Sequence, residues 1–427
     1  MPDKTDQCFC CATFQLISYD PKKLSTFLKP RLLIILNRLV IGGQSIDTIP
    51  LALALKDQFD ILVVYGEKEA DELEYDEALS HRGEISFLKI ASLKRSLNPL
   101  NDIAAFFRLK KVVKDFRPDV VHTHGSKPGL TGRPAAWFGG VKVILHTMHG
   151  HVFHSYYNRF VSGVIIRIER LLGRITTKIV VLSDEQQADI AGRYKIVPPG
   201  KTALIPLGID EAWLLRDAAT LRQQFREKYQ VSPEETAICI IGRMVPVKNH
   251  RLFIDTVIAM RQQAVPRTRF FVVGDGILKK ALQHRLDEAG ITWSDGPENA
   301  VATVIFTSWV TPITSVLHGM DIVTLTSLNE GTPVSIIEAQ MCSIPVVAVN
   351  VGGVKDTLLE NASGYLLKEH SAVQFSEALG KLAGDPVLRA QMGAKGYTFV
   401  RQKYSKQKEV EAFRALYTSA IANSIKN

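Results

Sequence analysis

The stretch NEGTPVSIIEAQMCSIPVVAVNVGG, residues 329–353, sets the pattern for the whole chain. The apolar run DIVTLTSL before it, residues 321–328, predicts a buried strand. The segment IPVVAV, residues 344–349, predicts a second strand, and the residues between the two are expected to form a short helix. Strands that alternate with helices in this way are typical of βαβ units in a parallel sheet.

The turn that opens the predicted helix carries two carboxylates. Gly331 allows a sharp backbone turn, Thr332 is a good N-cap, and Pro333 suits the first helical position. Glu330 precedes this turn, and Glu338 lies about five residues into the helix, roughly 8 Å along its axis. That separation is comparable to the distance from a diphosphate to its ribose, and a helix N-terminus favours an anion. We therefore expect a nucleotide-diphosphate site. The alternative is an ordinary βαβ unit with two solvated glutamates.

Length and composition are those of a globular protein with more than one domain. At 427 residues the chain is too long for one typical core, so two domains are expected. Hydrophobic residues make up 46% and charged residues 22%, which excludes a disordered chain. No apolar run approaches the roughly 18 residues that predict a transmembrane helix. Residues 1–29 lack the apolar core of a signal peptide and are expected to form a loose extension.

The positive charge is concentrated in the amino-terminal half. The net charge is +9, and residues 81–205 alone hold 20 lysines and arginines against 8 aspartates and glutamates. Such a surplus predicts an anionic partner: nucleic acid, a phosphorylated substrate or acidic lipid headgroups. The alternative is charge that serves only solubility. A nucleic-acid partner is disfavoured because no recognition motif is present.

The cysteines do not form a disulfide framework. They are odd in number and scattered, which indicates a reducing compartment: Cys8, Cys10, Cys11, Cys239 and Cys342. The first three form a cluster that could bind metal or be acylated, but no second cluster matches it.

The alternation of strands and helices runs through the chain twice. One set begins at residues 31–36 and ends near residue 205, and a second set begins at residues 237–241. The segment PLGIDEAW, residues 206–213, joins the two sets, and residues 369–422 are expected to be helical. The predicted fold class is α/β, with two Rossmann-like doubly wound domains that face each other across a cleft.

Two further turns after predicted strands can approach an anion. Gly42 and Gly43 precede the first helix, where a backbone without side chains can approach a phosphate or sugar. The spacing is not G-x-G-x-x-G, which counts against a nicotinamide or flavin cofactor. Arg243 and Lys248 follow the strand 237–241 and can converge on one diphosphate, although each could instead be a surface residue. The turn at residues 274–276 is expected to shape the cleft wall.

These segments together resemble the retaining glycosyltransferases of family 4. The resemblance rests on GRMVPVK (242–248), VVGDG (272–276), and E-G-x-P-x4-E followed by PVV and a Gly-Gly pair. HTHGSKPG (122–129), the TxHG segment at 147–150 and IPLGID (205–210) extend it from about residue 31 to the end. Such enzymes have the GT-B fold. Besides the loose extension expected at 1–29, the resemblance implies an acceptor domain at 30–207, a donor domain at 208–403, and a helix at 404–427 that returns to the first domain.

The resemblance also implies a role for each matching residue. Arg243 and Lys248 would stabilise the departing diphosphate, aided by helix N–H groups near Gly331, Thr332, Pro333 and Val334. Glu338 would hold the ribose, Glu330 would contact the donor sugar, and Gly43 would let the amino-terminal loop approach it. His149 would lie near the reacting sugar, which makes Glu330, His149, Arg243 and Lys248 the implied catalytic residues. No cofactor and no metal are expected. Ser343 departs from the family's usual glycine, which should affect the helix end and not the chemistry.

Two clusters of side chains leave alternatives open. Six histidines gather within a short segment, as they do in metal sites: His122, His124, His146, His149, His151 and His154. No acidic ligand accompanies them, so the simpler interpretation is polar rings that point into the cleft. Residues 153–178 interleave aromatic, aliphatic and arginine side chains, which fits either an anionic membrane surface or a core helix with one basic face.

The sequence therefore predicts a glycosyltransferase that acts in cell-surface polysaccharide biosynthesis. It would move a hexosyl or N-acetylhexosaminyl group from a nucleotide-diphosphate sugar, expected to be a UDP-sugar, to a glycan or polyprenyl-diphosphate-linked acceptor. A cytoplasmic enzyme at the inner face of the plasma membrane would explain the basic amino-terminal half. The rival functions are a sugar-nucleotide 2-epimerase with the same fold and a non-catalytic protein that binds sugar nucleotides.

Overall fold

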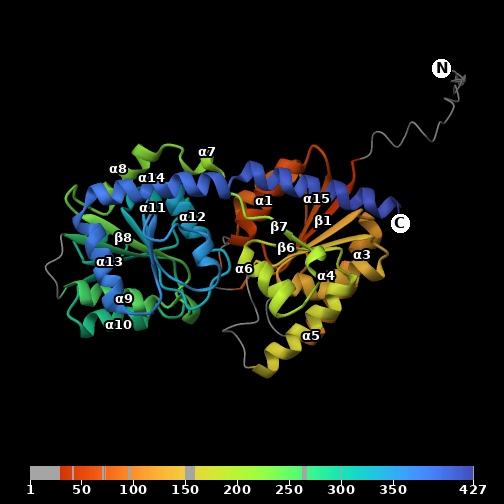
Figure 1. The fold of residues 1–427 in the computed structure, drawn as a ribbon, viewed down its shortest axis with the longest axis horizontal. Helices are drawn as coiled ribbons and strands as arrows, with labels where there is room; N and C mark the ends of the chain where they lie inside the picture. Colours follow the sequence, from red (N-terminus) through yellow and green to blue (C-terminus); the bar gives the residue numbers. More distant parts are fainter. Residues whose placement is uncertain are drawn as a thin grey trace, which may run out of the picture.

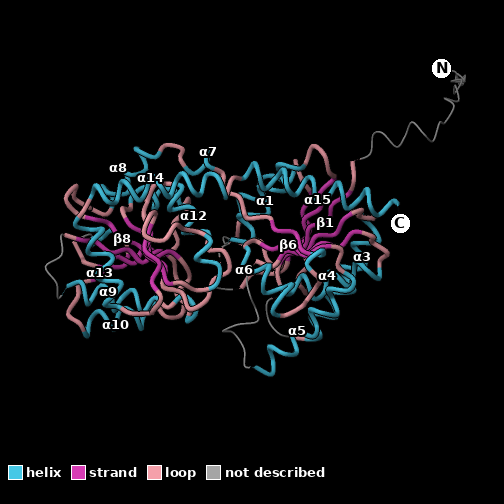
Figure 2. The backbone as a smooth tube through the Cα atoms, viewed as in Figure 1, coloured by secondary structure: helices cyan, strands magenta, loops and turns pink. Residues whose placement is uncertain are grey.

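Two parallel sheets form the framework of the protein. The computed structural model describes residues 29–426 apart from gaps at 41–42, 70–71, 73, 95–97, 150–158, 262–266 and 300. Each sheet has seven strands, and helices cover both faces of each (Figures 1 and 2). The predicted pair of doubly wound α/β domains is confirmed.

The amino-terminal sheet has the strand order β3-β2-β1-β4-β5-β6-β7, and every pairing in it is parallel. Its strands are β1 (Arg31–Leu36), β2 (Asp60–Tyr65), β3 (Ser86–Lys89), β4 (Val120–His124), β5 (Val143–Thr147), β6 (Lys178–Val181) and β7 (Thr202–Leu204). The order reverses between β1 and β4, so a crevice is expected at the carboxyl ends of these two strands.

Helices cover this sheet in two layers. On one face lie α1 (Gly43–Leu55) and α15 (Lys406–Lys426), and on the other α3 (Pro99–Phe116), α4 (Ser126–Phe138) and α5 (Arg159–Ile175) (Figure 1). The alternation along β1 explains this, since Ile34 packs in the core with α15 and Leu33 in the core with α3 and α4. Shorter helices are α2 (Asp76–Ser80), α6 (Asp184–Gln187), η2 (His81–Gly83), η3 (Ala188–Arg193) and η4 (Pro199–Lys201).

The carboxyl-terminal sheet has the order β10-β11-β9-β8-β12-β13-β14. Its strands are β8 (Thr236–Ile241), β9 (Thr268–Val273), β10 (Trp293–Asp295), β11 (Val304–Ser308), β12 (Ile322–Leu325), β13 (Val346–Val349) and β14 (Gly364–Leu367). Its helices are α7 (Glu211–Leu214), α8 (Ala218–Lys228), α9 (His250–Arg261), α10 (Lys279–Glu288), α11 (Ile313–Gly319), α12 (Val334–Met341), α13 (Ala372–Gly384), α14 (Pro386–Lys403), η5 (Pro246–Lys248), η6 (Pro297–Asn299) and η7 (Gly352–Asp356).

The last helix returns to the amino-terminal sheet. Phe413 and Tyr417 of α15 are buried in the core that contains β1 and α1. At the start of the helix, Lys406 Nζ lies 3.0 Å from Asp47 Oδ1 and also pairs with Glu409. These carboxylates raise the pKa of Lys406, against the opposing effect of burial. The chain's end is therefore held to its beginning by apolar packing and by a buried charge cluster.

One local prediction was wrong. Pro333, with φ of −74° and ψ of 107°, is extended and is itself the N-cap of α12, so the helix begins at Val334 and Thr332 does not cap it. The long helix α3 leaves two large apolar side chains, Ile103 and Phe107, 54% and 61% exposed. The buried face of this helix is formed by Ala105, Leu109 and Val113.

Candidate active site

Two loops at the carboxyl ends of neighbouring strands lie against each other. The loop after β8 contains η5, and the loop after β12 leads to α12. Thr326 Oγ1 donates to the carbonyl oxygens of Lys248 and Asn249, each at 3.0 Å, and Leu328 N donates to Val247 O. The segments GRMVPVK and NEGTPVS therefore form one surface, as their predicted role in one site requires.

Lys248 and Glu330 form an ion pair on this surface. Lys248 Nζ lies 2.6 Å from Glu330 Oε1, and Ser327 Oγ donates to the same oxygen at 2.6 Å. The side chains are 30% and 11% exposed, so the pair borders the solvent. Two donors on one carboxylate oxygen fix its orientation and lower its reactivity as a nucleophile.

Arg243 reaches across to the amino-terminal half. Its Nη1 lies 3.2 Å from Oε1 of the buried Glu72, which also pairs with Arg38. Arg38 belongs to the loop after β1, so this cluster joins the first strand's loop to the loop after β8. Sequence reasoning missed Glu72, because no motif surrounds it and 171 positions separate it from Arg243.

Four glycines are required by close packing of these loops. A Cβ at Gly274 would lie 2.2 Å from Gly242 O, and one at Gly276 would lie 2.6 Å from Met244 O. Next to the turn after β12, a Cβ at Gly352 would lie 2.0 Å from Glu330 O, and one at Gly353 would lie 2.2 Å from Gly331 O. The Gly-Gly pair thus supports the turn that carries Glu330.

Glu338 is a buried acid on α12. It is 6% exposed, and burial raises its pKa to about 8. The carboxyl group is therefore mostly protonated at neutral pH. A buried acid of this kind can donate one hydrogen bond and accept others, which suits a ligand with hydroxyl groups.

Ser343, at the end of α12, has a backbone conformation that is unusual for serine. Ser343 has a φ of 58°, the left-handed conformation that glycine adopts most readily at a helix C-terminus. A Cβ at Gly393 would lie 1.9 Å from Ser343 O, so α14 packs directly on this turn.

The histidines form a layer at the carboxyl ends of β4 and β5. His122 shares hydrogen bonds of 2.7 Å with Tyr417 Oη and with Thr147 Oγ1. His124 Nδ1 lies 2.9 Å from His149 Nε2, and the two rings are stacked. Burial lowers the pKa of all three histidines, that of His122 to about 3, so these rings are neutral at pH 7.

The remaining histidines complete this picture. His146 lies on the opposite face of the sheet, where its Nδ1 is 2.9 Å from Thr123 Oγ1. His151 and His154 lie outside the described residues. Within the part of the chain that the structure describes, no three His, Cys, Asp or Glu side chains are grouped as metal ligands would be.

Gly43 opens α1 beside this layer. The next residue, Gln44, donates through Nε2 to His124 O at 2.6 Å. The first loop of the amino-terminal half is therefore tied to the end of β4, on the edge of the sheet that bears His149.

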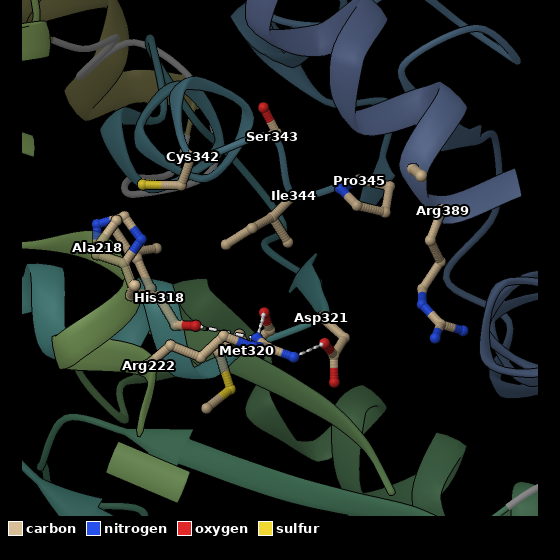
Figure 3. A pocket seen from close by; sticks show the side chains of 13 residues that line it. Ala218, Arg222, His318, Met320, Asp321, Cys342, Ser343, Ile344, Pro345 and Arg389 are labelled. Atoms are coloured by element: carbon tan, nitrogen blue, oxygen red, sulfur yellow. Dashed lines mark hydrogen bonds and ion pairs between the residues drawn. The ribbon is translucent and has the colours of Figure 1, made fainter. Parts of the chain in front are cut away.

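A cavity of about 390 Å³ lies elsewhere, at the amino ends of β12 and β13 (Figure 3). Its cations already have partners within the protein. Arg222 Nη2 donates to Asp321 Oδ1 at 2.8 Å, and Arg389 Nη1 donates to Ala383 O at 2.9 Å. This cavity lies at the amino ends of the strands, whereas Lys248 and Glu330 lie at the carboxyl ends, so we do not assign the chemistry to the cavity.

Comparisons with known proteins agree with this arrangement. Residues 41–213 match the family model "Glycosyltransferase Family 4", and residues 222–399 match "Glycosyl transferases group 1". An Escherichia coli UDP-Gal:alpha-D-GlcNAc-diphosphoundecaprenol alpha-1,3-galactosyltransferase is 27% identical over 337 residues, 78% of this chain and 84% of that protein. A GDP-mannose-dependent alpha-(1-6)-phosphatidylinositol monomannoside mannosyltransferase of Mycolicibacterium smegmatis is 24% identical over 345 residues, 78% and 84% of the two chains. Anabaena Alr3699/HepE, solved with UDP and glucose, has a TM-score of 0.76 at 17% identity and covers 91% of this chain and 100% of its own, which supports the GT-B fold.

Proposed function

The chain belongs to the family 4 glycosyltransferases, and we propose that it transfers a sugar from a UDP-sugar to a lipid-linked glycan with retention of configuration. One observation carries the proposal. Lys248 pairs with Glu330, four residues before the helix that bears Glu338, and Arg243 in the same loop as Lys248 pairs with Glu72 of the amino-terminal half. A sugar-nucleotide diphosphate matches this set of groups.

The cations would stabilise the leaving group. As the bond between the anomeric carbon and the phosphate oxygen breaks, negative charge grows on the diphosphate. Arg243 can offer two parallel N–H groups and Lys248 a point charge, both fixed by carboxylates before the ligand arrives. Such fixed charges need little reorganisation during the reaction.

The anomeric configuration is retained if the acceptor oxygen attacks the anomeric carbon from the same face that the phosphate leaves. The leaving phosphate oxygen would take the acceptor's proton, so no protein base is needed. Glu330 would contact the donor sugar and not attack it, because its Oε1 already accepts from Lys248 and Ser327. Rate enhancement would come mainly from position and charge stabilisation.

The nucleotide is proposed to be UDP on the basis of similar proteins. The Escherichia coli relative uses UDP-Gal by its name, and Alr3699/HepE was solved with UDP. The ribose hydroxyls would pair with the buried Glu338. No cofactor or metal has a part in this mechanism.

The acceptor is proposed to be lipid-linked, and we propose on this basis that the enzyme acts at the inner face of a membrane. The Escherichia coli relative acts on a diphosphoundecaprenol-linked sugar. Here α5 exposes Phe160, Val164 and Leu171 alongside Arg167 and Arg174, as an anionic membrane surface would require. No helix in the described ranges is long and apolar enough to span a bilayer. Phe153, Tyr156 and Tyr157 lie outside the described residues.

The experiment is a transfer assay with purified protein, a set of UDP-sugars and polyprenyl-diphosphate-linked acceptors. Mass spectrometry should detect a product, and proton NMR of the first product should show the donor's anomeric configuration. Lys248→Ala and Glu338→Ala should abolish transfer, while Lys381→Ala, an exposed lysine on α13, should not. An inverted product would contradict retention, and full activity in Lys248→Ala would contradict the site.

A further inference from the structure

A groove lies on the outer surface of the amino-terminal half, between α3 and the end of α4. Its volume is about 790 Å³, and its lining includes Phe107, Lys110 and Lys114 of α3 and Phe138 of α4. Lys110 Nζ lies 6.0 Å from the centre of the Phe138 ring, within the range of a cation–π contact. The groove therefore combines ammonium groups with exposed aromatic rings.

The helices around the groove carry half of the large apolar side chains that are exposed in the described residues. α4 packs against both α3 and α5, and the three cover one face of the sheet (Figure 1). Of the 18 large hydrophobic side chains exposed in the described part of the chain, nine lie on these three helices: Leu100, Ile103, Phe107, Leu130, Trp137, Phe138, Phe160, Val164 and Leu171. Exposed apolar side chains that gather on the helices of one face are typical of an interaction surface.

The exposed charges on the same helices are almost all positive. Seven basic side chains are exposed, namely Arg108, Lys110, Lys111, Lys114, Arg167, Arg170 and Arg174. Among the described residues of the three helices, Asp115 is the exposed acid, and it pairs with Lys111 at 2.7 Å. Glu169 is buried against Arg133 and does not offset this charge. The face is thus complementary to an anionic surface.

We propose that the outer face of α3, α4 and α5 docks on an anionic phospholipid bilayer and that the α3–α4 groove takes a phosphate-bearing lipid headgroup. The basic side chains meet the phosphates, and the aromatic rings suit the interface between headgroups and acyl chains. The protruding Leu100, Ile103 and Leu171 side chains can enter that acyl boundary, whereas a hydrated acidic glycan or nucleic acid offers them nothing to contact. Charge and apolar surface together therefore favour a bilayer.

The groove is separate from the active site. Pro118 and Val141, which line it, precede β4 and β5, so the groove is at the amino ends of these strands. His124 and Thr147 end the same strands on the opposite, carboxyl side, where His124 Nδ1 lies 2.9 Å from His149 Nε2. The headgroup in the groove is thus an anchor and not the acceptor. This inference rests on the proposed action at a membrane.

The test is co-sedimentation of the purified full chain with vesicles of phosphatidylcholine, with and without phosphatidylglycerol. The wild type should bind vesicles that contain phosphatidylglycerol and should bind only weakly to vesicles of phosphatidylcholine alone. Lys110→Gln/Lys114→Gln should weaken this binding about 30-fold, which corresponds to about 1 kcal/mol for each basic residue. Phe107→Ser/Phe138→Ser should weaken it about tenfold or more and leave less binding at high salt. Lys381→Gln/Lys395→Gln, two exposed lysines on α13 and α14, should bind as the wild type does.

Each outcome decides the matter. Equal binding by Lys110→Gln/Lys114→Gln and by the control, with unchanged circular dichroism in both, would overturn the groove as the anchor. Equal binding of the wild type to both kinds of vesicle would overturn the proposal that the groove takes an anionic headgroup. Tight, variant-sensitive binding to heparin without vesicle binding would assign the face to a soluble polyanion. The rise in melting temperature on addition of UDP is measured in parallel. It tests the proposed donor site, so a failure of the proposed function can be distinguished from a failure of membrane docking.

Discussion

Replacing the buried Glu338 with glutamine should make the protein more stable and less active. The carboxyl group's ordinary pKa is 4.5, and burial raises it to about 8. The fold therefore favours the protonated form, and the stability present below pH 4.5 is lost as the pH rises towards 8. At about 1.4 kcal/mol for each pH unit, the loss reaches roughly 3 kcal/mol at pH 7. Glutamine keeps the size of the side chain and one acceptor oxygen but cannot ionise.

The assay is urea denaturation of the wild type and Glu338→Gln between pH 5 and pH 8, with the exposed Glu377→Gln as control. The unfolding free energy of the wild type should fall relative to that of Glu338→Gln by roughly 3 kcal/mol between pH 5 and pH 7.5, a large part of a typical total. The control should follow the wild type. Donor binding by Glu338→Gln should weaken, because the amide offers the ribose hydroxyls one acceptor oxygen in place of two. Parallel pH profiles for all three proteins would refute the assignment of a raised pKa to Glu338.

Three further changes test the framework around the site. Ser343→Gly should raise the unfolding free energy by about 1 kcal/mol, because the left-handed φ of 58° disfavours serine; equal melting temperatures would contradict this. Glu169→Gln should lower stability by about 3 kcal/mol, since Arg133 is fully buried and would lose its charged partner, and a urea midpoint like that of the wild type would argue against a buried pair. Lys406→Met should lower the free energy of unfolding by about 3 kcal/mol and speed hydrogen exchange in α15, because it leaves Asp47 and Glu409 without their cation. Unchanged hydrogen exchange in α15 would show that apolar packing alone holds the helix.

The sequence predicted the framework because its signals were local. Apolar runs such as residues 344–349 form strands wherever both faces of a sheet are covered, and alternation with helices requires parallel pairing. The turn around Glu330 and the cations at Arg243 and Lys248 follow strands directly, so their meeting at one edge could be inferred from the order of elements.

Features that depend on distant contacts could not be predicted. Glu72 meets Arg243 only because two separate halves face each other, and nothing near Glu72 in the sequence indicates this. Apolar residues occur all around α3, so their spacing could not show that Phe107 points outward. The prediction that Thr332 caps α12 was wrong for a local reason. Thr332 and Pro333 both fit positions at a helix start, and the extended ψ of Pro333 makes Pro333 the N-cap.

Calorimetric titration of UDP into the purified protein tests the central claim most directly, because it measures the donor site without the acceptor. The wild type and Lys381→Ala should bind UDP alike. Lys248→Ala should bind it at least about tenfold more weakly, as one charge-assisted hydrogen bond contributes about 1.5–3 kcal/mol. Equal affinity of all three proteins for UDP would contradict the assignment of Lys248 and its loop to the donor diphosphate.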